Sequence, residues 1–374
     1  MTQILLVQPD FPIPAKSKNH SNFLPIGLLK LAAYYRKNGC RVELNRGNHL
    51  ASFVPDRVLI SSLFTYWSSY VKEAVDYYRK SYPLASIEVG GIYATLMPQH
   101  CKEFTNCDKV FVGQHKGAEK CKPAYDLVNV DYQIIHGMRG CSNKCIFCGI
   151  WRIEEQSFKN AAQIEKEICS NKVIFYDNNM LINPNIDEIL LMLAKKIYSG
   201  RVLQCECQSG FDGRVLMQKP HLAQMLKKAR FRNVRLAWDF PHTEENVSKV
   251  GDWIALLESV GYNRKNIYIF MIYNWNYSPE QLFLKRAQCY SWGVQISDCR
   301  FRPLNQTFDH YNSRANYQTG EEYFIHPGWS DLEIRRFRKE VRRHNICIRQ
   351  NIPWDKYDVV LERLSSKSKV AVVS

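Results

Sequence analysis

Three cysteines crowd into eight positions of this chain. Cys141, Cys145 and Cys148 lie in one short loop that directly follows a predicted strand, with the spacing Cys-x-x-x-Cys-x-x-Cys. Iron-sulfur clusters usually take four cysteine ligands, so a loop that supplies three leaves one iron free to bind another molecule. The spacing therefore predicts a [4Fe-4S] cluster with an open iron, which is a place where a reaction can occur.

Two other interpretations compete for these cysteines. One is a structural zinc site completed by a distant residue such as Cys169 or His136, and the other is a set of inert buried thiols. Zinc sites more often combine a Cys-x-x-Cys pair with a second pair far away in the sequence. The three-cysteine spacing therefore favours the cluster.

The run CSNKCIFC resembles the CxxxCxxC motif of the radical S-adenosylmethionine (SAM) superfamily, and the preceding MRG is similar to the TRG or SRG found there. The resemblance implies that Cys141, Cys145 and Cys148 ligate the cluster and that Phe147 packs near the SAM adenine. It implies that SAM chelates the open iron and is cleaved to a 5'-deoxyadenosyl radical. The electron is expected from an external donor such as flavodoxin or ferredoxin.

Polar residues at other predicted strand ends are candidates for binding SAM, because ligands of barrels gather at the carboxyl ends of strands. Where the superfamily often has Gly-Gly-Glu, this chain has Asp177 and Asn179, which are either polar acceptors for the SAM amino group or turn residues that cap the next helix. Further candidates are Gln208, Ser209 and Asp239. Asp239 fits a contact with ribose hydroxyls or substrate, and equally a helix cap or a loop role.

The remaining late cysteines have no recognisable ligand framework. They are Cys205, Cys207, Cys289, Cys299 and Cys347. A second cluster and a hydrogen-atom donor are alternatives, but buried free thiols are favoured.

The first part of the chain alternates buried-strand patterns with helical patterns, which is typical of an α/β fold with a parallel sheet. Strands are predicted at 4–7, 41–44, 58–61, 86–89 and 110–112, and helices at about 25–38 and 71–80. We expect a flavodoxin-like, doubly wound domain over residues 1–126.

The alternation continues in the second part with strands predicted near 133–136, 173–176, 202–205, 234–238, 267–272 and 294–297. Strands in this number with helices between them predict a partial (β/α)6 TIM barrel over residues 127–304, followed by a basic helical extension over 305–374. Ser278 is the predicted N-cap of one helix, with Gln281 completing a capping box. Leu222, Met225, Leu226 and Ala229 mark the buried face of another.

The first domain also resembles the cobalamin-binding domain that precedes the barrel in one large radical SAM subgroup. The likeness lies in ILLVQPD, FLPIGLLKLAAYYRKNGCRVEL and EVGGIYATLMPQ, and it places Ser61, Leu63, Gly90 and Gly91 beside the nucleotide tail of cobalamin. The Asp-x-His-x-x-Gly segment that carries the lower cobalt ligand is missing, and His20 stands in a different context. Cobalamin binding without a protein histidine and a retained scaffold that binds nothing are both open.

Composition and charge indicate the compartment and the kinds of partner to expect for this chain. Apolar residues make up 45% and charged residues 23%, and the first residues form a strand pattern without a basic leader, so a soluble cytoplasmic protein without a membrane span is expected. The net charge of +15 fits nucleic acid, an acidic partner or an anionic substrate. Much of the excess lies late, in Arg335, Arg336, Arg338, Lys339, Arg342, Arg343 and Arg349. A solvated helix face is favoured there over a binding surface.

These patterns together predict a radical SAM enzyme whose substrate no motif specifies. Methyl transfer is expected if cobalamin binds, and otherwise another radical reaction in a cobalamin-independent enzyme with a scaffold domain. The alternative from a different class is a basic iron-sulfur or zinc protein that binds nucleic acid without catalysis.

Overall fold

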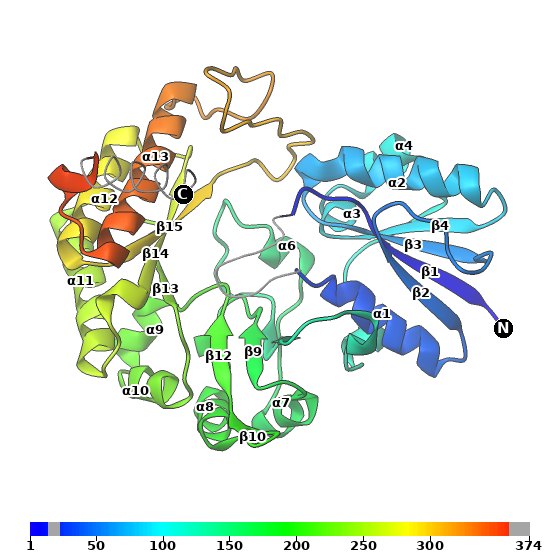
Figure 1. Cartoon of the computed structure of the whole chain (residues 1–374), viewed down its shortest axis with the longest axis horizontal. Coiled ribbons are helices and arrows are strands. Elements are labelled where there is room, and N and C mark those ends of the chain that lie inside the picture. Colours follow the sequence, from blue (N-terminus) through cyan, green and yellow to red (C-terminus); the bar gives the residue numbers. More distant parts are fainter. Residues whose placement is uncertain (14–22, 359–374) are drawn as a thin grey trace, which may run out of the picture.

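The computed structural model describes residues 1–13 and 23–358 of the chain. It is a mixed α/β structure built on parallel sheets, as predicted. Figure 1 shows the first sheet with its helices at the right, and a second group of strands and helices at the left. His20 and residues 359–374 lie outside the described residues.

A five-stranded sheet forms the first part of the chain, with strand order β2-β1-β3-β4-β5 and every neighbouring pair parallel. The strands are β1 Gln3–Gln8, β2 Arg41–Arg46, β3 Arg57–Ser62, β4 Ser86–Gly91 and β5 Lys109–Phe111. All the strands predicted for this part are confirmed, with small shifts at their ends.

Helices cover both faces of this sheet. The helix α1 (Ile26–Lys37) packs on the face to which Ile4 and Leu6 point, and α2 (Ser68–Ser81) packs on the face to which Leu5 and Val7 point. Because alternate residues of β1 are buried on opposite sides, the strand reads as a continuous apolar run. This part is completed by η1 (Thr65–Trp67), α3 (Ile92–Leu96), α4 (Pro98–Thr105), α5 (Lys116–Glu119) and η2 (Tyr125–Leu127).

The glycine pair at the end of β4 has a structural reason. Gly91 has a φ of 110°, and a Cβ there would lie 2.2 Å from the carbonyl oxygen of Ser62. The backbones of β3 and β4 therefore approach too closely at this point for a side chain, and Gly91 lets the chain turn directly into α3. A Cβ on Gly90 would lie 3.5 Å from the Phe111 side chain, which is an ordinary contact.

The second part contains two three-stranded parallel sheets, ordered β12-β9-β6 and β13-β14-β15. Isolated parallel bridges, Cys205 with Phe231 and Phe211 with Leu236, connect the two sheets between β12 and β13. The strands are β6 Gln133–Ile135, β9 Lys172–Phe175, β12 Gln204–Cys207, β13 Val234–Ala237, β14 Ile267–Tyr273 and β15 Gln295–Arg300.

One predicted strand of this part begins two residues later than expected. The predicted strand 202–205 is in fact β12, which starts at Gln204, because Val202 belongs to a short antiparallel hairpin. The hairpin joins β10 (Ile197–Tyr198) to β11 (Arg201–Val202) through Ser199 and Gly200, both with positive φ. Val202 pairs with Ile197 in this hairpin and is exposed, so the buried strand begins only after it.

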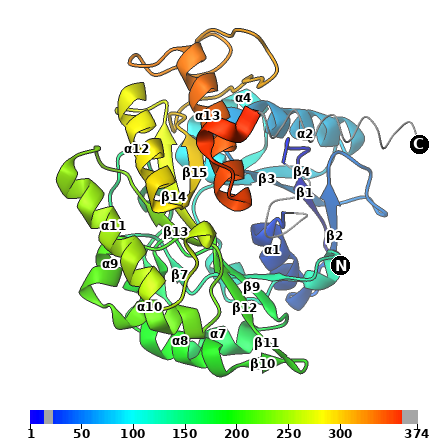
Figure 2. The same ribbon diagram turned by 60° about the vertical axis from the view of Figure 1, so that its left-hand side comes forward.

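Helices surround the strands of the second part (Figures 1 and 2). They are α7 (Ala161–Glu167), α8 (Ile186–Lys195), α9 (Gly213–Gln218), α10 (His221–Lys228), α11 (Glu244–Ser259) and α12 (Pro279–Trp292), with the turns η3 (Met180–Ile182) and η4 (Arg264–Asn266). One apolar core extends from Ile135 to Val341 beneath them. The predicted face of α10 is confirmed, since Leu222 and Leu226 are fully buried.

The start of α12 agrees only in part with its sequence signal. The Ser278 hydroxyl oxygen accepts from the Gln281 amide, as expected for an N-cap. The reciprocal bond of a capping box is replaced, because the Gln281 side-chain oxygen accepts at 2.7 Å from the amide of His242. Gln281 thus ties α12 to the loop after β13.

The basic extension is helical where it is described, in α13 (Asp331–Gln350) and the turn η5 (Trp354–Lys356). Several of its arginines have internal partners: Arg335 pairs with Asp331, Arg336 with Glu340, Arg343 with the Trp354 carbonyl and Arg349 with the Gln295 side chain. Four of the seven late basic residues named above therefore have partners within the protein.

Residues 301–330 connect β15 to α13 and return to the first part of the chain. The Ser68 hydroxyl donates to the Thr307 carbonyl at 3.0 Å, and the Arg302 guanidinium lies 4.5 Å from the centre of the Tyr66 ring. None of the helices in the described part of the chain has the length and apolar composition needed to cross a membrane.

We predict that Gly91→Ala lowers the free energy of unfolding by about 2–4 kcal/mol, because the new methyl group overlaps the Ser62 carbonyl in a left-handed backbone conformation. Chemical denaturation measures the change. Gly27→Ala is the matched control, since no atom lies within 4 Å of its Cβ position, and it is expected to leave stability unchanged or slightly raised. Equal stability of Gly91→Ala and the wild type would contradict this explanation.

Candidate functional site

The cysteine loop lies between β7 (Met138–Arg139) and α6 (Ile150–Ile153). Its backbone is held locally, since the Cys148 amide and the Trp151 indole both donate at 3.0 Å to the Cys145 carbonyl. A short antiparallel pairing of β7 with β8 (Ser157–Phe158) closes the base of the loop. The predicted ligands Cys141, Cys145 and Cys148 are all half-buried.

The three thiols lie near one another. Burial raises the pKa of Cys145, and the neighbouring Asp239, Cys148 and Cys141 raise it further. Burial is also the main cause of the raised pKa of Cys148, to which Cys141 contributes. In the part of the chain that is described, no group of three or more His, Cys, Asp or Glu side chains is arranged to hold a single metal ion.

The aromatic position of the motif faces another aromatic residue across the site. The ring centres of Phe147 and Trp275 are 6.2 Å apart with an edge-to-face angle of 82°. Trp275 follows β14 and contacts Phe301 at a centre-to-centre distance of 3.9 Å. The structure thus supplies an aromatic surface beside the cysteine loop.

Asp177 is completely buried directly after β9. Its Oδ2 accepts from the Gly137 amide at 3.0 Å, while its Oδ1 is buried without a hydrogen-bond partner among the described residues. Burial raises the pKa of Asp177 to about 7, against the opposing effect of the Gly137 and Met138 amides. One oxygen of this buried carboxyl group therefore has no hydrogen-bond partner among the described residues.

Two further predicted residues have the same property. The side-chain oxygens Asn179 Oδ1 and Gln208 Oε1 are buried, and within the described ranges neither has a hydrogen-bond partner. Asn179 makes no side-chain cap with η3, and α8 begins after Asn185, so the expected capping role of Asp177 and Asn179 is wrong. Buried polar atoms normally have partners, so these oxygens indicate a ligand or bound water.

Asp239 follows β13, and it does not cap α11, whose N-cap is Thr243. Burial raises the pKa of Asp239 to about 6, although Lys285 and Arg214 oppose the shift. Lys285 of α12 is almost fully buried, donates to the Trp238 carbonyl at 3.2 Å and lies 4.4 Å from the Tyr277 ring centre. Burial lowers the pKa of Lys285 to about 8. Ser209, in contrast, is exposed at the end of β12.

Sequence reasoning missed Glu154, Arg214 and Lys285. Glu154 accepts from the Gly140 amide at 3.0 Å and from the Asn178 side chain at 2.8 Å. Arg214 belongs to no recognisable sequence motif. Its charge nevertheless lies close enough to Cys141 and Cys145 to interact with both. No local sequence signal marks these residues, because Glu154 directly follows α6 and Arg214 and Lys285 lie within α9 and α12.

The other cysteines are free thiols, as predicted, and all thirteen cysteines of the chain are unpaired. Cys205, Cys207, Cys289 and Cys347 are buried, whereas Cys299 is exposed and departs from that expectation. Cys299 lies near the end of β15, where burial of the surrounding strand is incomplete.

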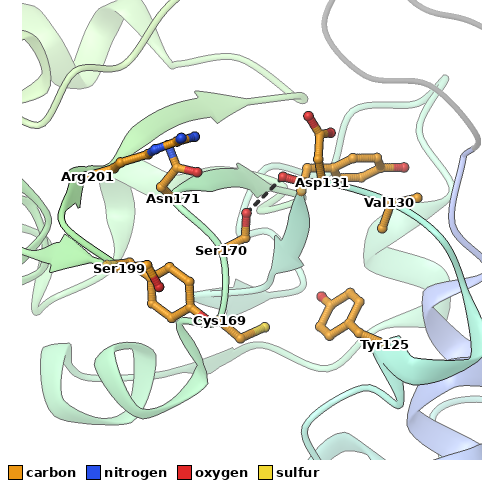
Figure 3. Close-up of a pocket in the computed structure, with 10 residues that line it drawn as sticks. Tyr125, Val130, Asp131, Cys169, Ser170, Asn171, Ser199 and Arg201 are labelled. Carbon is orange, nitrogen blue, oxygen red and sulfur yellow. Dashed lines mark hydrogen bonds between the residues drawn. The ribbon is translucent and has the colours of Figure 1, made fainter.

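A cavity of about 390 Å³ lies at the opposite ends of the strands. Figure 3 shows its lining, which includes Asp131, Ser170 and Arg201 from the segments that precede β6, β9 and β12. Cys169, the suggested fourth zinc ligand, lines this cavity and precedes β9, whereas the cysteine loop lies beyond the carboxyl ends of β6 and β9. This cavity is therefore separate from the candidate site.

The residues expected beside cobalamin have contacts within the first sheet. The Ser61 hydroxyl donates to the Val7 carbonyl at 3.2 Å, and Leu63 packs into the core beneath α2. Gly91 is required by the approach of β3 to β4, as described above, and Gly90 lies beside Phe111. These contacts explain the residues without a ligand.

Comparisons with known proteins add no family to these observations. The scan of the sequence against protein-family models finds no match, and no curated protein matches the chain.

We predict that Asp177→Asn changes the pH dependence of stability. The pKa of Asp177 is about 7 in the folded chain against an ordinary value of 3.8, so the folded state binds more protons between these limits and loses stability as the pH rises through them. The variant lacks this loss. Its free energy of unfolding relative to the wild type should therefore rise by up to about 1.4 kcal/mol per pH unit between about pH 4 and 7.

Chemical denaturation of both proteins at several pH values, without added SAM, tests this. A difference that stays constant with pH would show that the Asp177 carboxyl is not held in the protonated form by burial.

Proposed function

We propose that this chain is a radical SAM enzyme. The observation that carries the proposal is a loop with three neighbouring thiols that Glu154 ties to the segment after β9, where buried side-chain oxygens have no hydrogen-bond partner in the described part of the chain. Cys141, Cys145 and Cys148 supply the thiols, Asp177 and Asn179 supply these oxygens, and Gln208 after β12 supplies another. A polar ligand with several hydrogen-bond donors satisfies such a set, and SAM carries an ammonium group and ribose hydroxyls.

The residues fit the two expected cofactors. The cysteine loop would hold a [4Fe-4S] cluster through three thiolates, and the oxygens after β9 and β12 would bind SAM. The cluster with SAM bound supplies a one-electron reductive cleavage that starts radical chemistry. The electron is proposed to come from an external flavodoxin or ferredoxin.

The side chains of this protein orient the ligand and exclude water. The paired rings of Phe147 and Trp275 offer an apolar surface for a flat base. Asp239, with a pKa of about 6, would be ionised at neutral pH and would accept hydrogen bonds from hydroxyl groups. Lys285 of α12 would balance its charge. Substrate specificity would come from the loops around these residues.

Strand order supports the finer description of the fold. The order 2-1-3-4-5 of the first sheet is the flavodoxin-like order. The order β6-β9-β12-β13-β14-β15 of the second part follows the chain, as in a barrel that does not close. We propose a doubly wound domain over 1–126, a partial barrel over 127–304 and the extension over 305–374.

For the first domain we favour a scaffold over a cobalamin site, because Ser61 and Gly91 are already engaged within the sheet. Cobalamin binding, and with it methyl transfer, stays a prediction. The absorbance spectrum of anaerobically purified protein decides between them. Only iron-sulfur absorption is expected, and corrinoid bands would contradict the scaffold proposal.

The nucleic-acid alternative has less support from the structure than from the charge. Arg335, Arg343 and Arg349 are engaged within the protein, which leaves fewer cations for phosphate groups.

Replacing a proposed ligand tests the enzyme proposal. Reconstituted wild-type protein should bind about four iron atoms per chain and form 5'-deoxyadenosine with SAM and dithionite. Cys145→Ala should lose the product and most of the cluster absorbance. Cys121→Ala, which replaces a half-buried cysteine outside the site, should behave as the wild type. Equal product from the wild type and Cys145→Ala would refute the proposal.

A further inference from the structure

A chain of ion pairs runs from the first domain to the cysteine loop. It begins at Lys30 of α1, whose side chain is 5% exposed and donates to Glu119 of α5 at 2.7 Å. The opposite oxygen of Glu119 accepts at 3.0 Å from Arg139, the residue two positions before Cys141. The first domain therefore contacts the base of the cysteine loop through a charged group.

Arg139 connects Glu119 to Glu154. Its guanidinium donates on one side to Glu119 and on the other to Glu154 at 2.9 Å, and its side chain is 18% exposed. Two carboxylates thus hold the planar guanidinium from opposite sides, which fixes its orientation.

Glu154 is the last residue of this series of ion pairs, and it contacts both the cysteine loop and the segment after β9. One oxygen pairs with Arg139, and the other accepts from the Gly140 amide at 3.0 Å and from the Asn178 side chain at 2.8 Å. Gly140 precedes Cys141, and Asn178 stands between Asp177 and Asn179. One carboxylate therefore sets the cysteine loop against the segment that carries the unpaired oxygens.

The charged groups in this series of ion pairs interact strongly with one another. Burial alone would raise the pKa of Glu119, but Arg139 and Lys30 outweigh it and hold this pKa at about 2. Removing one member leaves the next with an unpaired, partly buried charge, which favours a rearrangement of the side chains.

We propose that Glu119 and Glu154 are positioning residues, through which the first domain fixes the cysteine loop relative to the SAM-binding oxygens. This inference rests on the proposed function. Shifts of about 1 Å in such an arrangement are enough to weaken binding and reaction. The first domain thereby has a role in the radical SAM site that requires no ligand of its own.

The test uses full-length reconstituted protein with the variants Glu119→Gln and Glu154→Gln. The first removes the charge that links the domains, and the second removes the charge between the two loops. SAM is titrated into the reduced protein, and its affinity is read from the change in the electron paramagnetic resonance signal of the cluster. The reduction potential of the cluster is measured on the same samples.

We expect both variants to bind SAM roughly 10- to 100-fold more weakly than the wild type, with a shifted cluster signal and with iron content unchanged. The two effects should be less than additive in the double variant, because both act through Arg139.

Glu88→Gln is the matched control. Glu88 pairs with Arg57 at 2.7 Å, and its side chain is 12% exposed, as is that of Glu154, but the pair lies within the first sheet. It should leave SAM affinity and the cluster signal unchanged while lowering stability to a similar extent.

The outcomes separate the two proposals. A wild-type protein that forms no cluster, or whose cluster signal is unaffected by SAM, overturns the proposed function. A wild type that binds SAM, with a Glu119→Gln variant that binds it equally well, overturns only the positioning inference. If Glu119→Gln does not fold, Glu119→Asp keeps the charge but shortens its reach, and wild-type SAM affinity in that variant likewise overturns the inference.

Discussion

The carboxylate of Glu154 holds together the two segments on which the candidate site depends. The cysteine loop and the segment after β9 are irregular, so neither can rely on a continuous ladder of backbone bonds. Contacts with the Gly140 amide and the Asn178 side chain replace that ladder. Because Arg139 and Glu119 extend these contacts into the first part of the chain, the position of the cysteine loop depends on residues from both parts.

Local patterns in the sequence predicted the elements well, since apolar periodicity is a property of neighbouring residues. The strands beginning at Gln3 and Val234 follow directly from buried apolar runs, and the cysteine loop follows from its spacing. The ion-pair partners could not be predicted in this way. Glu119 and Arg139 are twenty positions apart and belong to different secondary-structure elements, so no period connects them.

The capping box expected at α12 illustrates the same limit. Its local half formed, but Gln281 bonded to His242, which only the fold brings near. The capping alternative for Asp177 and Asn179 fails because both side chains are buried before α8 begins. Buried oxygens without partners destabilise a fold, so a bound ligand or water would stabilise these residues.

The pKa of Asp177, about 7, has a consequence for any amine that enters the site. At neutrality this carboxyl is shared between its acid and its conjugate base, and an arriving ammonium group selects the base. Binding of such a group would then release a proton to the medium, so acidification would compete with the ligand. Binding at this site would, in that way, follow the acidity of the surroundings.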